Sequence, residues 1–274
     1  MFISVNGCSL FVQDEGKGVP LVFVHGFPLS SKMWEPQIKN LKKNYRTIAY
    51  DCRGHGQSAV GDGITSVEDH VDDLVALLDE LKLPKVILVA LSMGGYIALR
   101  LAARNPDRLM GLILLDTRAE ADSNEGKLKR FRALKDIRLN GLAPYAETSI
   151  LSLFSEETLN KEHPIVDLVF EMIMNSNAHA VMGTLLSLAS RYDMTDALAA
   201  ITVPTLLLVG EYDLITPVST MEAMAQQIPG AKFCVVPGAG HMSNLENASF
   251  VNDCIRLYLD TCLEHSEVHE EVLV

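Results

Sequence analysis

Short apolar runs alternate along this chain with longer stretches in which apolar residues recur every three or four positions. The runs are almost continuous in Val, Ile and Leu, which is typical of parallel strands covered on both faces. Their alternation with helix-length stretches predicts an α/β fold, with a mostly parallel central sheet and helices on both faces. Six runs are candidate strands: PLVFVHG (20–26), RTIAYD (46–51), KVILVAL (85–91), RLMGLILLD (108–116), VPTLLLVG (203–210) and AKFCVVP (231–237).

Two segments outside these runs carry local signals of their own. The first fifteen residues predict an antiparallel hairpin that turns at Asn6-Gly7. Further along, Thr65 offers a helix N-cap with Glu68 three residues later, as in a capping box. A crossover helix is expected after this signal, with apolar positions at helical spacing: Val67, Val71, Leu74, Leu78 and Leu81.

The regular alternation stops in the middle of the chain. From 117 to 199 only apolar and charged helical stretches occur, which predicts a helical cap inserted after the strand that ends at Asp116. The predicted core is therefore discontinuous, formed by residues 1–116 and 200–264. The polar tail, residues 265–274, is expected to fray.

Composition and charge exclude several classes of protein. The chain has 274 residues, of which 48% are hydrophobic, and no apolar run approaches the length of a membrane span. The N-terminus lacks a basic region followed by a long apolar one, so no secretory signal is expected and the cytoplasm is the expected location. A net charge of −12 disfavours a nucleic-acid partner. Five irregularly spaced cysteines argue against a disulfide framework and a zinc site.

One serine lies where a strand is expected to pass straight into a helix. In VALSMGGYIAL (89–99), Ser92 has a small residue two positions away on each side, Ala90 and Gly94. A sharp strand-to-helix turn admits only small residues there, and it lifts the hydroxyl above the carboxyl ends of the strands. The usual motif has Gly at the first of these positions, and Ala meets the same steric requirement. Ser92 is therefore a candidate nucleophile, with capping of the following helix as the alternative.

A serine nucleophile needs a base, and a carboxylate that orients the base. Asp213 follows one late strand candidate, and His241 lies on a Gly-rich loop after the last one. The order Ser92, Asp213, His241 is the order in which α/β folds of this kind supply a triad. His25 and His55 each stand beside a glycine in early loops and are expected to tie loops together.

Five short motifs occur in a fixed order along the chain. They are His25-Gly26-Phe27-Pro28, Asp51-Cys52-Arg53-Gly54-His55-Gly56-Gln57-Ser58, Ser92-Met93-Gly94-Gly95, Gly210-Glu211-Tyr212-Asp213, and Gly240-His241 with Glu246 behind it. Together they resemble the α/β-hydrolase fold family over nearly the whole chain. Within that family the chain is most similar to small carboxylesterases and 3-oxoadipate enol-lactonase-like enzymes, and nearly as similar to the cofactor-free haloperoxidases.

The resemblance assigns roles to matching residues. It implies that the backbone N–H groups of Phe27 and Met93 form an oxyanion hole, since acyl transfer develops negative charge on the carbonyl oxygen. It implies neither a metal ion nor a cofactor. Serine at position 92 argues against dehalogenase and epoxide-hydrolase chemistry, for which relatives place Asp at this turn. Ala248 replaces a proline that is common in the family, which affects the start of the final helix and leaves the triad intact.

The acid is the one triad position with two candidates. Asp213 and Asp116 both follow apolar strands, and some relatives place the acid after the strand that ends here at Asp116. The spacing Gly210-x-x-Asp213 followed by Pro217 matches the commoner arrangement. Asp213 is therefore the predicted acid.

The predicted function is hydrolysis of a carboxylic ester through an acyl-enzyme. Lactone hydrolysis and perhydrolysis use the same triad and stay open as alternatives. A ligand-binding receptor on the same fold is a further alternative, which an intact triad disfavours. The expected partner is a small-molecule ester or lactone, and the oligomeric state is left open.

The cap is expected to supply an apolar wall of the substrate pocket. Met172, Met174 and Met182 occur among apolar residues at helical spacing, and Phe27 and Met93 are expected at the pocket floor. This predicts uncharged acyl groups of short to medium length, and poor activity on charged diacids. Preference for a charged lactone would instead require an arginine of this segment to turn inward: Arg130, Arg132, Arg138 or Arg191.

Overall fold

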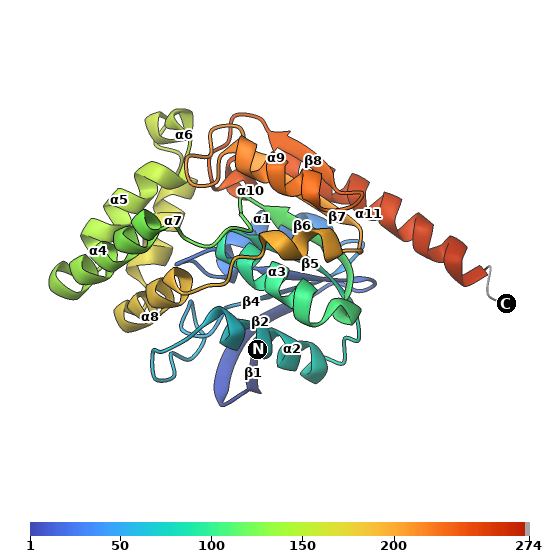
Figure 1. Cartoon of the computed structure of the whole chain (residues 1–274), viewed down its shortest axis with the longest axis horizontal. Coiled ribbons are helices and arrows are strands. Elements are labelled where there is room, and N and C mark those ends of the chain that lie inside the picture. The colour runs from blue at the N-terminus through green and yellow to red at the C-terminus, as the bar shows by residue number, and fades with distance from the viewer. Residues whose placement is uncertain (272–274) are drawn as a thin grey trace.

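The centre of the protein is one eight-stranded sheet, seen in a computed structural model that describes the backbone of residues 1–271 and the side chains of residues 1–262 (Figure 1). The strand order is β1-β2-β4-β3-β5-β6-β7-β8. The strands are β1 (Phe2–Val5), β2 (Cys8–Glu15), β3 (Pro20–Val24), β4 (Arg46–Tyr50), β5 (Val86–Leu91), β6 (Leu109–Leu115), β7 (Thr205–Gly210) and β8 (Lys232–Val236).

The strand directions confirm the predicted α/β fold. β1 pairs with β2, and β2 with β4, in antiparallel fashion, whereas the five remaining neighbouring pairs from β4 to β8 are parallel. All six candidate runs form strands, each ending within two residues of its expected limits. The hairpin turns at Asn6 and Gly7, both at positive φ, as predicted. β5 and β7 are buried at every position, which explains their continuous apolar sequence.

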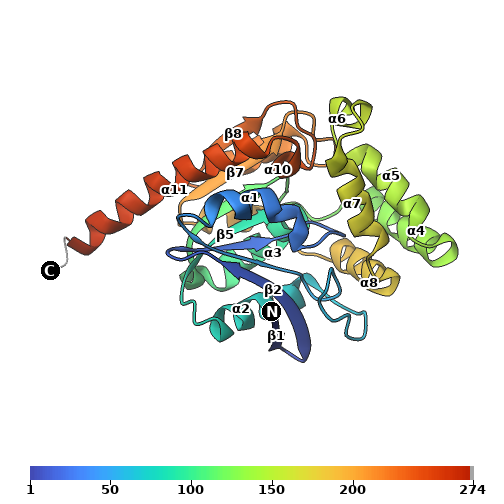
Figure 2. The ribbon, with the colours of Figure 1, turned by 180° about the vertical axis from the view of Figure 1, so that it is seen from behind.

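Helices cover both faces of the sheet. Figure 1 shows α2, α3 and α9 on the near face, and Figure 2 shows α1 and α11 on the opposite face. The sheet therefore has a separate apolar core on each side. The helices outside the insertion are α1 (Glu35–Leu41), α2 (Val67–Glu80), α3 (Met93–Arg104), α9 (Val218–Gln227), α10 (Ser243–Glu246) and α11 (Ala248–Glu271), with short 3₁₀ helices η1 (Ser31–Trp34), η2 (Pro106–Arg108) and η3 (Thr195–Ala200).

The crossover helix α2 begins one residue later than predicted. Ser66, not Thr65, is the N-cap: its hydroxyl accepts from the Asp69 N–H, and the Asp69 carboxylate accepts from the Ser66 N–H. An Asp at the third helical position closes the capping box as well as a Glu does. The expected Thr65–Glu68 pair is therefore wrong, and Glu68 is free to pair with Arg100 on α3.

Five helices lie between β6 and β7, beside the carboxyl ends of the parallel strands (Figure 1). No strand occurs between residues 117 and 199, as predicted. The division into core and cap stays a prediction, and we call α4–α8 the inserted helices. The expected frayed tail, residues 265–274, falls where the structure describes no side chains. The inserted helices are α4 (Asn124–Asn140), α5 (Ala143–Leu153), α6 (Glu156–Asn160), α7 (Pro164–Met174) and α8 (Ala178–Ala189).

Two expectations from composition can be compared with the described residues. Through residue 271, no helix combines the length and apolar character that crossing a membrane requires. None of the five cysteines, all within the described residues, forms a disulfide bond. The two that come together, Cys234 and Cys254, hold their sulfur atoms 4.0 Å apart, about twice the length of a disulfide bond.

Candidate active site

Ser92 lies at the turn between β5 and α3, with strained backbone angles of φ 54° and ψ −114°. The turn is held by its neighbours, because the Ser92 N–H donates to Leu115 O and the Thr117 hydroxyl donates to Ser92 O. Gly94 is required here, since a Cβ at that position would overlap the carbonyl oxygen of Val24. The sequence therefore forms the sharp strand-to-helix turn that the spacing predicted.

His241 lies between β8 and α10 and faces Ser92. Its Nε2 is 2.9 Å from Ser92 Oγ, and its Nδ1 is 2.8 Å from Asp213 Oδ2. Because Asp213 accepts at Nδ1, that nitrogen carries the proton and Nε2 is left to accept from the serine. The structure thus brings the three predicted residues together into one hydrogen-bonded chain.

Asp213 is held by the turn that follows β7. Its Oδ1 accepts from the N–H groups of Ile215 and Thr216 at 2.7 and 2.9 Å, and the Thr216 hydroxyl donates to Oδ2. Burial alone raises the pKa of Asp213, but the positive charge of protonated His241 and the hydrogen bonds from His241 and Thr216 outweigh it and hold the pKa below its usual value. The carboxyl is therefore ionised when it orients the imidazole.

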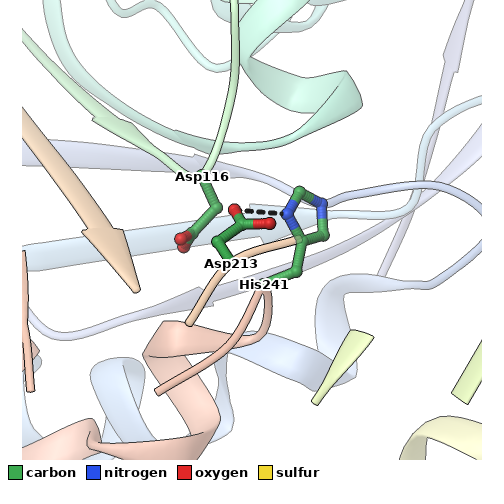
Figure 3. A group of neighbouring side chains, drawn as sticks. All are labelled: Asp116, Asp213 and His241. Atoms are coloured by element: carbon green, nitrogen blue, oxygen red, sulfur yellow. Dashed lines mark hydrogen bonds and ion pairs between the residues drawn. The ribbon is translucent and has the colours of Figure 1, made fainter. Parts of the chain in front are cut away.

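Asp116, the alternative acid, lies beside Asp213 but is not bonded to the histidine (Figure 3). One of its oxygens accepts from the Gly210 N–H at 2.8 Å, and the other accepts from the Ser243 hydroxyl. Burial, together with the negative charge of Asp213, raises the pKa of Asp116 well above its usual value. Asp116 therefore braces the ends of β6 and β7, and Asp213 is the carboxylate in contact with His241.

Within the part of the chain that the structure describes, these two aspartates and His241 are the one cluster of possible metal ligands. Each offers an atom within 4.8 Å of the others. The atoms that face inward already have protein partners, since Asp213 is bonded to His241 and Asp116 to Gly210 and Ser243. The hydrogen-bonded pairs fit a proton-transfer chain, so we assign no metal to the cluster.

Two residues that line the same cavity as Ser92 have backbone N–H groups without a partner in the described part of the protein. Within residues 1–271, neither Phe27 N nor Met93 N has a hydrogen-bond acceptor in the protein. Phe27 and Met93 line one cavity together with Ser92 and His241. Unpaired backbone donors beside a nucleophile fit an oxyanion hole.

The cavity above Ser92 measures about 140 Å³. Both the core and the inserted helices contribute polar and apolar residues to its lining. The core side contributes Phe27, Pro28, Ser92, Met93, Tyr96, Ile215 and His241, and the inserted helices contribute Arg130, Tyr145, Ser149, Ser152, Leu153 and Leu188.

The predicted methionine wall is wrong. Met172 is buried away from the cavity, where its sulfur accepts from the Ser30 hydroxyl. Met174 is 39% exposed, and Met182 packs in the small core between α4 and α8. None of the three lines the cavity above Ser92, to which α7 contributes no residue and α8 contributes only Leu188.

Arg130 on α4 does turn inward, which the sequence-based pocket excluded. Its guanidinium is bonded to Asp122 through Nε and Nη2. Asp122 also binds Arg191, whose guanidinium lies 4.2 Å from the centre of the Tyr96 ring. Among the other candidate arginines, Arg132 and Arg138 are exposed. The premise that no cationic group lies in the pocket is therefore wrong.

The early-loop histidines do tie loops together, as expected. His25 Nε2 accepts from the Cys52 N–H at 2.9 Å, and His55 Nδ1 lies 3.1 Å from the Arg53 carbonyl oxygen. Burial lowers the pKa of His25 to about 4. Burial, together with the charge of His25, lowers the pKa of His55 to about 3. Both imidazoles are therefore neutral near neutral pH and serve the framework.

Glu246 joins the histidine loop to the inserted helices, a role that its motif did not reveal. One oxygen accepts from the Gly240 N–H at 2.7 Å, next to His241. The other accepts from the N–H and hydroxyl of Ser155 and from the Thr158 hydroxyl, at 2.7 to 2.9 Å. This carboxylate therefore fixes the loop that carries His241.

Sequence comparison agrees with this geometry. The sequence model of the alpha/beta hydrolase fold family matches residues 19–248. The chain belongs to this family. It is 30% identical to 3-oxoadipate enol-lactonase 1 of Acinetobacter baylyi, with 90% of this chain and 91% of the relative covered. It is 33% identical to the non-heme chloroperoxidase CPO-A1 of Kitasatospora aureofaciens, with 86% and 90% covered.

A solved structure within the family is closer still in sequence. A thermophilic esterase from Thermogutta terrifontis, solved with malate bound, superimposes with a TM-score of 0.91 at 40% identity, covering 95% of this chain and 97% of the esterase. The resemblance to the α/β-hydrolase family is thereby confirmed. The relatives are a lactonase, a haloperoxidase and an esterase, so they do not distinguish among these activities.

Sequence reasoning missed the polar residues that the inserted helices aim at Ser92. Tyr145, Ser149 and Ser152 on α5 line the cavity. They stand at i, i+4 and i+7, on one face of the helix. That spacing was a usable signal. Arg130 had none, because nothing in the sequence tells which of several arginines on α4 faces inward.

Proposed function

We propose that the chain is a serine esterase that cleaves a carboxylic ester through an acyl-enzyme. The observation that carries the proposal is the hydrogen-bonded chain Asp213–His241–Ser92, with the serine opening into a cavity that is also lined by two residues with unpaired backbone N–H groups. Nucleophile, base, orienting carboxylate and oxyanion donors are the complete set that acyl transfer needs.

The first half of the reaction forms the acyl-enzyme. Ser92 Oγ attacks the carbonyl carbon while its proton passes to His241 Nε2. The N–H groups of Phe27 and Met93 stabilise the oxyanion, and each such donor contributes about 3 kcal/mol to the transition state. His241 then gives the proton to the departing alkoxide, and the C–O bond breaks to release the alcohol.

The second half repeats these steps with water. His241 takes a proton from water as its oxygen attacks the acyl carbon, and Ser92 leaves with that proton. Asp213 keeps the imidazole in the tautomer that both halves require and stabilises its protonated form. The apolar floor around Phe27, Met93 and Ile215 supports an acyl chain of short to medium length next to the carbonyl.

Lactone hydrolysis is the second candidate, because a relative 30% identical over 90% of the chain is named an enol-lactonase. A lactone is an ester whose alcohol stays tethered, so the same groups act in the same order. Perhydrolysis, suggested by the relative named a chloroperoxidase, differs in using peroxide as the second acceptor. A receptor without turnover would have no need for the aligned His241 and Ser92.

The proposal is tested with short 4-nitrophenyl esters and a fluorophosphonate probe. We expect ester turnover and covalent labelling of Ser92 by the probe. Ser190→Ala, at an exposed serine at the end of α8, is the matched control and should leave labelling and turnover unchanged. Ligand binding without turnover or labelling would favour the receptor. Comparing water with peroxide as acceptor, and linear esters with lactones, separates the three reactions.

Two further assignments belong with this proposal. The inserted helices act as a cap over Ser92, with residues 1–116 and 200–264 as the hydrolase core. The cytoplasm stays the expected location of the protein. A small uncharged or singly charged metabolite as substrate fits that location. Fractionation of cells that express the full chain would test the location.

A further inference from the structure

Arg130 gives the cavity above Ser92 an electrostatic character that ester hydrolysis alone does not need. It is the one lining residue that carries a permanent charge, and no Asp or Glu lines the cavity. Besides Ser92, four hydroxyl groups share the lining with it, those of Tyr96, Tyr145, Ser149 and Ser152. The cavity thus combines one positive charge with several polar groups, in a protein whose net charge is −12.

Arg130 shares its acidic partner with a second arginine. Asp122 is bonded to two guanidinium groups, those of Arg130 and Arg191, so one carboxylate faces two cations. Arg191 is the more deeply buried of the two, with a side chain 3% exposed against 22% for Arg130, and it also donates to two backbone carbonyls, at Leu188 and Glu120. The two guanidinium groups therefore share the single carboxylate of Asp122, which neutralises Arg130 only in part.

The guanidinium of Arg130 still has donors to offer. Nε is engaged with Asp122 and Nη2 is only loosely bonded to it, at 3.3 Å. Nη1 has no hydrogen-bond partner anywhere in the described part of the chain. Holding a cation that is only partly neutralised in a partly buried cavity costs free energy unless an anion completes it. The two Nη groups present the planar edge that binds a carboxylate through two parallel hydrogen bonds.

We propose that Arg130 forms a subsite for a carboxylate at the far end of the acyl group. The substrate class is then an ester or lactone whose acyl part carries a second carboxylate, such as a half-ester of a short dicarboxylic acid. The apolar floor takes the methylene chain, Ser92 takes the ester carbonyl, and Arg130 takes the terminal carboxylate. This inference rests on the proposed esterase function, and it reverses the sequence-based expectation that charged diacids are poor substrates.

The test compares two 4-nitrophenyl esters of equal chain length, the half-ester of glutaric acid and the neutral pentanoate. Arg130→Met keeps the length of the side chain and removes its charge. We expect kcat/KM for the half-ester to fall by about 10- to 100-fold, as expected for loss of a charged hydrogen-bonding partner, with the pentanoate within about threefold of wild type. Arg130→Lys should give an intermediate value, because the charge stays and the planar edge is lost.

The matched control is Arg132→Met, at an exposed arginine on the same helix. It should change neither ester. An equal loss on both esters in Arg130→Met would assign Arg130 a purely structural role and overturn the subsite. So would an unchanged ratio of the two esters.

Binding of free glutarate, measured by calorimetry, keeps the subsite testable apart from turnover. We expect wild type to bind glutarate at least about 10-fold more tightly than Arg130→Met, whose folding is checked by thermal unfolding. Equal binding would overturn the subsite. If glutarate binding depends on Arg130 but neither ester is cleaved, the esterase proposal fails while the subsite stands.

Discussion

The two sides of the cavity are built in different ways. On the core side, Ser92, Asp213 and His241 each lie just after a parallel strand, so the backbone of the sheet sets their positions. On the other side, the side chains of Arg130 and of α5 reach the cavity from helical faces. We therefore expect the sheet to position the residues that carry out the reaction, and the inserted helices to select the acyl group.

Loss of the nucleophile should have the largest effect. Ser92→Ala is expected to lower kcat for a neutral ester by at least about 10³-fold, because the residual oxyanion donors alone accelerate the reaction only weakly. The midpoint temperature of thermal unfolding should stay close to that of wild type, since only one hydroxyl is removed. Retention of more than about a hundredth of wild-type kcat would contradict the role of Ser92 and move the chemistry away from the core side.

Replacing the acid of the triad should have the next largest effect. It also tests which of the two aspartates is the acid. Asp213→Asn is expected to cut kcat by about 10⁴-fold, because the amide favours the wrong tautomer of His241. Asp116→Asn should cost less than about tenfold, since Asp116 is bonded to Gly210 and Ser243 and not to the histidine. The kcat of both variants, measured in parallel, checks the assignment; the reverse ranking would make Asp116 the acid.

The folded state should lose stability at acid pH because it contains buried, neutral imidazoles near the site. Burial first, then the charges of His55, His25 and Arg53, lower the pKa of His70 to about 3, against a partial opposing effect of Asp69. The unfolded chain, with histidines near 6.5, binds more protons than the folded chain as pH falls below that value. Stability is therefore present in full above about pH 6.5 and is lost progressively toward pH 3.

Replacing one of these imidazoles measures the effect. Each buried neutral histidine should make the free energy of unfolding about 2 kcal/mol smaller at pH 5 than at pH 7. His70→Phe should remove that share, so its urea unfolding at the two pH values should differ less than that of wild type. An unchanged difference would mean that His70 is protonated in the folded protein.

The smallest effects should separate packing on the inserted helices from recognition on the core side of the cavity. Met174→Ala should change kcat/KM by less than about twofold and stability by within about 0.5 kcal/mol, because its side chain is 39% exposed and lies off the cavity. Ile215→Val, which trims a lining residue, should shift the preferred acyl length by about one methylene, worth about 1 kcal/mol. A marked effect of Met174→Ala on chain-length preference would restore the methionine wall.

The same contrast explains what could be predicted from the sequence. The strands and the spacing around Ser92, Asp213 and His241 were readable because sheet geometry allows few residues at each such turn. The start of α2 was misplaced by one residue, since Thr65 and Ser66 carry the same local signal and only the tertiary structure decides between them.

The inserted helices were harder to predict, because an amphipathic face can pack against any apolar neighbour. The methionines fitted a pocket wall as well as a core, and helical periodicity does not distinguish these. The pairing of Asp122 with both Arg130 and Arg191 joins residues 8 and 69 positions apart, which no local pattern encodes. The charge of the cavity depends on that pairing.

Glu246 links the core side of the cavity to the inserted helices through hydrogen bonds. Its carboxylate holds Gly240, beside His241, and also Ser155 and Thr158 at the start of α6. The Met242 N–H donates to Leu153 O at the end of α5, which adds a second fastening at the same junction. Displacing this end of the insertion must either break these bonds or pull the base out of line with its serine. This junction therefore ties the position of the general base to the packing of α5 and α6.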